Sequence, residues 1–85
     1  MPYIKPEKRN EFEELEIIAD NCETAGDLCY CFYKIICLFI KRKGLSFSTW
    51  TMCLSALESA KLEFYRKHVA SYEDEKIKEH GDIEL

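Results

Sequence analysis

The stretch Leu28-Cys-Tyr-Cys-Phe-Tyr-Lys-Ile-Ile-Cys-Leu-Phe-Ile40 contains a single charged residue, Lys34, among aliphatic, aromatic and cysteine side chains. Such a run is too short to cross a bilayer as a helix, which takes about 20 apolar residues. We therefore predict a buried core helix. A chain of 85 residues has few other elements to cover it, and small domains often complete their burial by oligomerisation. We expect this helix to pack against a second copy of the chain.

Signals for the start and end of helices occur on both sides of this stretch. Thr24-Ala-Gly-Asp27 has the spacing of a capping box, with Asp27 in place of the usual Glu or Gln. Three cations and Gly44 follow the apolar run, which is typical of a helix C-terminus. Pro6 suits a first helical turn, and either Ser46 or Ser48 begins the next helix.

These signals predict an all-α, three-helix domain with a short charged C-terminal extension. The expected helices cover about residues 6–21, 25–43 and 48–70, and the tail covers 71–85. Within this tail, residues 73–80 have a helical pattern that Gly81 would cap. No stretch alternates polar and apolar residues for long enough to predict a strand. We interpret residues 1–85 as one domain.

Composition narrows the class of protein. A hydrophobic content of 47% excludes a disordered chain. The net charge of −4 argues against a general nucleic-acid binder. The N-terminus has no apolar signal-peptide region, so we expect a cytosolic protein whose five cysteines stay reduced and act as small buried hydrophobes. We expect no membrane partner.

The central helix divides into two faces when its residues advance by about 100° each. The Phe32 face consists of Leu28, Phe32, Ile35 and Phe39, with Cys31 and Ile36 beside it, and we assign it to the core of the chain. The Tyr30 face consists of Asp27, Tyr30, Lys34, Cys37 and Lys41. Two interpretations of the Tyr30 face stay open: a solvated face whose stems cover apolar neighbours, or a second interface. Under the second interpretation the oligomer contact includes Tyr30, Tyr33, Cys37 and Ile40.

Lys61 lies on the apolar stripe of the third predicted helix, between Leu54 and Leu57 on the helical wheel. A buried ammonium without a partner is costly, so Lys61 must reach solvent, pair locally with Glu58 or Tyr65, or face a cavity. Under the cavity alternative it binds an anion. The candidate ligand-binding residues are then Tyr30, Lys34, Lys61, Tyr65 and Arg66.

The sequence contains no pattern that predicts an enzyme, a cofactor or a metal site. Cys29 and Cys31 point to nearly opposite sides of a helix, and paired zinc ligands are usually spaced differently. A cysteine nucleophile needs an oriented histidine, and only His68 and His80 are available. The cluster Lys41-Arg42-Lys43 could touch a phosphate, a membrane edge or an acidic partner, although the helix C-terminus that it ends is a sufficient explanation.

Several motifs resemble those of a family of small tailed-bacteriophage proteins of unknown function. Gly26-Asp27-Leu28-Cys29-Tyr30 is similar to a Gly-Glu-Leu-Asn-Tyr motif of that family. The similarity also includes the opening Met1-Pro2-Tyr3-Ile4, the runs 57–67 and 72–77, and Gly81-Asp82. Ser71 stands where the family pattern has proline, which should make the exit from the third helix less sharply broken. Cys29 and His80 each stand in place of an asparagine.

The resemblance implies a phage or prophage origin and no enzymatic activity. Small phage proteins of this kind act by binding host components. Our first hypothesis is an oligomeric protein, a dimer or larger, that sequesters an anionic nucleotide-like signal of host antiviral defence at its subunit interfaces. The alternative is an inhibitor or adaptor that binds a host or phage protein. A nucleic-acid accessory protein ranks third because of the acidic charge balance.

Overall fold

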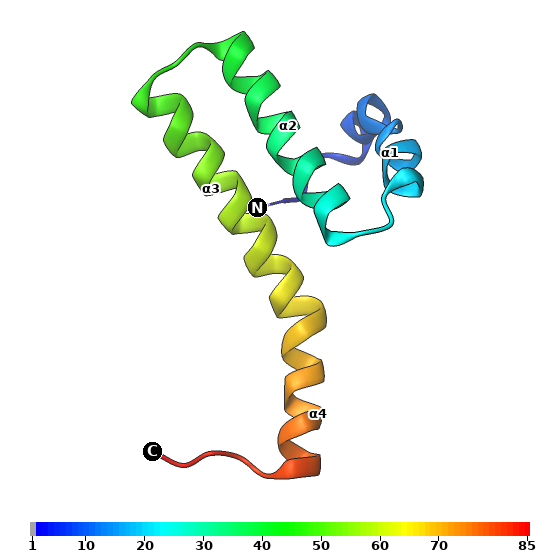
Figure 1. Cartoon of the computed structure of the whole chain (residues 1–85), viewed down its shortest axis with the longest axis vertical. Helices are drawn as coiled ribbons and strands as arrows, with labels where there is room; N and C mark the ends of the chain where they lie inside the picture. The colour runs from blue at the N-terminus through cyan, green and yellow to red at the C-terminus, as the bar shows by residue number, and fades with distance from the viewer. Residues whose placement is uncertain (1) are drawn as a thin grey trace. The chain divides into compact units, whose positions relative to one another are not determined.

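The computed structural model describes residues 2–85 and contains helices and no strands within that range, which confirms the all-α prediction (Figure 1). The number of helices was wrong, because four α-helices are present rather than three. In chain order the elements are the 3-10 helix η1 (Pro6–Phe12), α1 (Leu15–Asn21), α2 (Ala25–Lys43), α3 (Phe47–Phe64), the π-helix η2 (Tyr65–Val69) and α4 (Ala70–His80). The chain forms two compact units, one of residues 3–54 and one of Pro2 with residues 55–85.

Helix α2 has the bounds that its capping signals predict. The Asp27 amide donates to Thr24 Oγ1 at 3.1 Å, and the Thr24 amide donates to Asp27 Oδ2 at 3.3 Å, which completes the capping box. The Glu23 amide donates to the same carboxylate oxygen at 2.9 Å. At the other end, Gly44 has a φ of 99° and its amide donates to the Ile40 carbonyl. The backbone therefore leaves α2 in a conformation that favours glycine.

The first predicted helix, over about residues 6–21, is interrupted. This segment begins with the 3-10 helix η1 at Pro6, passes through a turn at Glu13 and Glu14, and becomes α-helical only at Leu15. In a continuous α-helix Glu7, Glu11 and Glu14 would follow at four- and three-residue steps on one side. Like charges at these spacings are destabilising, so the carboxylates favour the break.

The start of α3 is decided by Ser46 rather than Ser48. The Thr49 amide donates to Ser46 Oγ at 3.1 Å, and the Ser46 and Thr49 hydroxyl oxygens lie 3.0 Å apart. Ser46 therefore satisfies an amide that the first helical turn leaves without a backbone acceptor.

The sequence predicted that helical structure ends near residue 70, but the helical conformation continues beyond that point. The π-helix η2 follows α3 directly, and α4 continues through Ser71 to His80, where Gly81 ends it with a φ of 87°. The expected tail is thus helical over most of its length. The absence of proline at position 71 explains the continuation, because proline would disfavour helical backbone in the residue before it. The helical pattern of residues 73–80 was a correct prediction.

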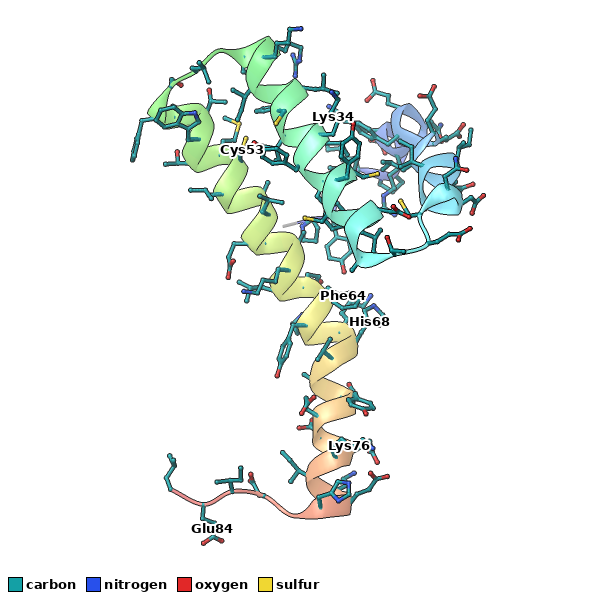
Figure 2. The ribbon with its side chains drawn as sticks, viewed as in Figure 1. Lys34, Cys53, Phe64, His68, Lys76 and Glu84 are labelled. Atoms are coloured by element: carbon teal, nitrogen blue, oxygen red, sulfur yellow. The ribbon has the colours of Figure 1, made fainter. Side chains whose placement is uncertain are left out.

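Very few side chains are buried in this chain. Among residues 2–85, Thr49 and Cys53 are the buried ones, and Cys53 lies on α3 where it faces α2 (Figure 2). The assignment of the Phe32 face to the chain's own core was wrong: Phe32 is 55% exposed, Leu28 and Ile35 are exposed as well, and only Phe39 is half-buried. The apolar faces of the helices are therefore left largely exposed within a single chain.

Replacing Thr24 with alanine should lower the free energy of unfolding by about 1 kcal/mol, because the substitution removes the cap of α2. Urea denaturation followed by circular dichroism measures this loss. Thr51→Ala is the matched control, since the exposed Thr51 hydroxyl donates only to the Ser48 carbonyl inside α3. An equal effect of the two substitutions would contradict the importance of the capping box.

The stability that Asp27 supplies should depend on pH. Two backbone amide donors, of Glu23 first and Thr24 second, lower the pKa of Asp27 below its ordinary value of 3.8. The lowered pKa favours the folded state above the pKa of the unfolded chain, and this contribution is lost as the pH falls through the folded pKa. The difference in unfolding free energy between wild type and Asp27→Asn should be constant from neutral to weakly acidic pH and should narrow below about pH 4. A pH-independent difference would contradict this assignment.

Candidate functional site

The Tyr30 face of α2 presents a phenol and an ammonium to solvent on successive turns. Tyr30 is 64% exposed, and Lys34, four residues later, is also exposed. Among residues 2–85, no carboxylate lies within ion-pair distance of Lys34. This pair can offer an aromatic surface and a positive charge to a partner molecule.

The other predicted interface residues lie further along the same helix. Tyr33 is exposed, and hydrogen bonding to the Cys37 thiol, with the charge of that group, raises the pKa of the Tyr33 phenol. Cys37 and Ile40 line an open hollow of about 430 Å³ together with Lys41, Gly44 and Leu45. The structure thus brings Cys37 and Ile40 together at the C-terminal end of α2.

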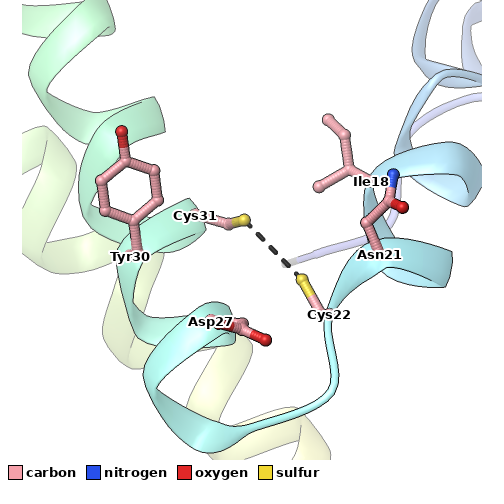
Figure 3. Close-up of a pocket in the computed structure, with 6 residues that line it drawn as sticks. All are labelled: Ile18, Asn21, Cys22, Asp27, Tyr30 and Cys31. Carbon is pink, nitrogen blue, oxygen red and sulfur yellow. Dashed lines mark hydrogen bonds between the residues drawn. The ribbon is translucent and has the colours of Figure 1, made fainter.

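A second hollow lies between the end of α1 and the N-terminal half of α2. Figure 3 shows its lining, which includes Ile18 and Asn21 from α1 and Tyr30 from α2. Its volume is about 300 Å³. The Cys22 and Cys31 sulfur atoms are 3.8 Å apart across it. Desolvation, followed by the interaction with Cys31, raises the pKa of the Cys22 thiol.

Lys61 belongs to the other unit and does not occupy a cavity. Its side chain is 74% exposed, and its Nζ lies 3.9 Å from Glu58 Oε1. Exposure and local pairing were two of the three alternatives, and the structure combines them. An exposed ion pair of this kind contributes little to stability, so the charge of Lys61 remains accessible.

Tyr65 and Arg66 follow Lys61 at the start of η2. Tyr65 is exposed, whereas the Arg66 guanidinium makes two hydrogen bonds to the Glu63 carboxylate, at 2.5 and 2.9 Å. Arg66 and Glu63 also line a shallow hollow of about 240 Å³. This bidentate pairing restrains Arg66, and an anion that binds there has to compete with Glu63.

His68 makes a ring contact that fits a structural role. Its ring centroid lies 5.4 Å from that of Phe64, with the two ring planes at 42° (Figure 2). Phe64 and His68 are the last residue of α3 and the fourth of η2. The contact therefore links the α-helix to the wider π-helical turn that follows it.

The described part of the chain offers no metal centre. No group of three or more histidine, cysteine or acidic side chains in residues 2–85 is arranged to hold a metal ion. Within the same range, no helix is both long enough and apolar enough to cross a bilayer. The exposed side chains described above offer aromatic surface, hydrogen bonding and positive charge.

Sequence reasoning missed two features of these surfaces. Leu45, which is 79% exposed, extends the hollow near Cys37, and its exposure depends on how the loop between α2 and α3 turns. The Cys22–Cys31 contact depends on how α1 folds back on α2. Helical spacing within one element predicts neither feature, because both depend on the path of a connecting loop.

Comparison with known proteins identifies a family for the chain. No curated protein and no solved structure matches it. A family model described as "Domain of unknown function (DUF6899)" matches residues 1–83. Because this match covers almost the whole chain, the protein belongs to the DUF6899 family.

Proposed function

We propose that this protein is a self-associating, non-enzymatic binding protein of phage origin that works in the host cytosol. It holds a small anionic, nucleotide-like signal of host antiviral defence at contacts between its copies. The observation that carries the proposal is the amount of apolar surface that a single chain leaves exposed. The motifs shared with tailed-phage proteins support the origin, and the exposed aromatic and cationic side chains support the class of ligand.

The surface that a single chain exposes favours self-association. The chain exposes 8005 Å². Folded monomeric proteins of 10.0 kDa expose about 5,200 Å², so the excess is about 2,800 Å². A stable interface of standard size buries about 800 Å² on each partner. Contact with one or more further copies would cover this excess and supply the hydrophobic stabilisation that the single chain lacks.

Tyr30 and Lys34 are the residues that favour an anionic ligand. A tyrosine ring can stack on a base, and a lysine ammonium pairs with phosphate. No carboxylate in the described range neutralises Lys34. On one chain this pair is open to solvent. A second copy facing it would form a pocket with two walls, the kind of concave site in which small ligands bind.

The alternative is an inhibitor or adaptor that binds a host or phage protein. The exposed acidic and apolar side chains of η1, α1 and the turn between them, including Glu11, Phe12 and Glu13, favour it. Native mass spectrometry of the protein purified from its host separates the two functions. A bound small molecule supports the first, and a stoichiometric second protein supports the alternative.

Light scattering at micromolar concentration should give the mass of a dimer or a larger assembly. Tyr30→Glu and Cys37→Glu should each reduce that mass, because each places a charge in the expected contact. Tyr72→Glu is the matched control, since Tyr72 is about as exposed as Tyr30 but lies on α4. A monomeric wild type would refute self-association.

Anionic nucleotides, cyclic and linear, should raise the melting temperature of the wild type if one of them is the ligand. A ligand present at 100 times its Kd stabilises by about 2.7 kcal/mol, a shift of several degrees for a domain of this size. Lys34→Ala and Tyr30→Ala should each weaken binding at least about tenfold. Lys67→Ala is the control because it removes an equal charge from η2. Absence of any shift across the panel would refute the ligand class.

A further inference from the structure

The charges of the unit formed by residues 3–54 are separated by sign. From Asn10 to Tyr33 the sequence contains seven carboxylates and no lysine or arginine. From Lys34 to Leu54 it contains four cations and no carboxylate. Three of these cations, Lys41, Arg42 and Lys43, occupy the last turn of α2. The unit therefore has a negative part, made of the end of η1, α1 and the start of α2, and a positive part at the loop between α2 and α3.

The two charged parts do not neutralise each other within one chain. No ion pair joins a carboxylate of residues 10–33 to any of the four cations in the described structure. The contact between α1 and α2 is at Cys31, and eleven residues of helix separate Cys31 from Arg42, a rise of about 16 Å. At physiological salt, charges interact over about 8 Å. The Cys22–Cys31 contact therefore lies about twice this distance along α2 from Arg42.

Both charged parts also expose large apolar side chains. At the positive part, Leu45 and Phe47 are 79% and 77% exposed, and Trp50 is exposed on the next turn. At the negative part, Phe12 and Ile17 are exposed. Each surface therefore combines one sign of charge with apolar area. The two are complementary to each other, and each would repel its own kind.

We propose that the loop between α2 and α3 of one copy docks on η1 and α1 of a second copy. In this contact Leu45 and Phe47 pack against the apolar side chains around Phe12 and Ile17, while Lys41–Lys43 face the carboxylates of Glu11–Glu16. The contact rests on the proposed self-association and adds a direction to it. Because two different surfaces meet, the arrangement is head-to-tail, and repetition of it forms a ring if the rotation closes.

A second copy fits the positive end better than an anionic membrane does. The complementary acidic and apolar surface is carried by every copy, so it is present at the same concentration as its partner. The whole chain has a net charge of −4, which disfavours its approach to a negative bilayer.

Charge reversal tests the contact directly. One variant combines Lys41→Glu, Arg42→Glu and Lys43→Glu, and another combines Glu11→Lys, Glu13→Lys and Glu14→Lys. Each variant alone places like charges in the contact, so its association should weaken by more than about tenfold and its mass in light scattering should fall. Mixing the two variants restores opposite charges wherever one variant contacts the other, so the mass of the mixture should rise above that of either variant alone. Variants that keep the wild-type mass, or a mixture whose mass does not rise, would overturn the proposal.

Two further variants test whether a loss of mass comes from the contact itself, rather than from unfolding or from a change in net charge. Leu45→Ser with Phe47→Ser removes apolar area that is mostly exposed on a single chain, so it should lower the mass and leave helical content, measured by circular dichroism, unchanged. Unchanged mass in this variant would overturn the contact. Lys67→Glu, Lys76→Glu and Lys78→Glu together change the net charge as much as the first reversal but lie outside the contact, and should keep the wild-type mass. An equal loss of mass in this control would also overturn it.

The remaining outcomes separate the contact from the proposed function and from a lipid partner. A monomeric wild type refutes self-association itself, whereas an oligomeric wild type with unaffected reversal variants refutes only this contact. Vesicles containing phosphatidylserine provide the lipid arm. If they sediment the wild type but not the Lys41/Arg42/Lys43 variant, and the two have equal mass in free solution, the loop binds lipid and the proposal is overturned.

Discussion

The constraint on which this structure depends is a shortage of apolar contact within one chain. The helices of residues 2–85 form through local signals, such as the capping box of Thr24 and Asp27 and the hydrogen bonds of Ser46. Packing adds little, since Thr49 and Cys53 are the buried residues of this range. Isolated helices are marginal in water, and most helical stability in proteins comes from tertiary burial of an amphipathic face. The exposed faces of α2 and α3 therefore gain little stability from burial within the chain.

The sequence predicted some elements well for a physical reason. The bounds of α2 were predictable because the capping box and the glycine after the last cations are local signals whose effect needs no tertiary contact. The break after η1 and the continuation through η2 were not predicted. Both depend on a balance between neighbouring charges, side-chain packing and backbone geometry, and hydrophobic periodicity does not resolve that balance.

Some features of the candidate site were likewise predictable from the sequence, and others were not. The proximity of Tyr30 and Lys34 follows from a four-residue spacing in a helix, so the sequence was sufficient for it. The local pairing of Lys61 with Glu58 was also one of the expected alternatives. The approach of Cys22 to Cys31 and the exposure of Leu45 depend on the course of two loops. The error over the Phe32 face has another cause: an apolar helix face looks the same in sequence whether its own chain or another covers it.

The π-helix η2 has a consequence for how the second unit can evolve. A π-helical turn holds about one residue more than an α-helical turn does, so it absorbs the extra residue within Tyr65–Val69 and leaves the helix faces before and after it aligned. Deleting one residue from this segment would restore regular α-helix while the side chains of α4 keep nearly the same orientation relative to residues 55–64. The length of the chain can therefore change by one codon at η2 without altering which α4 side chains a partner meets.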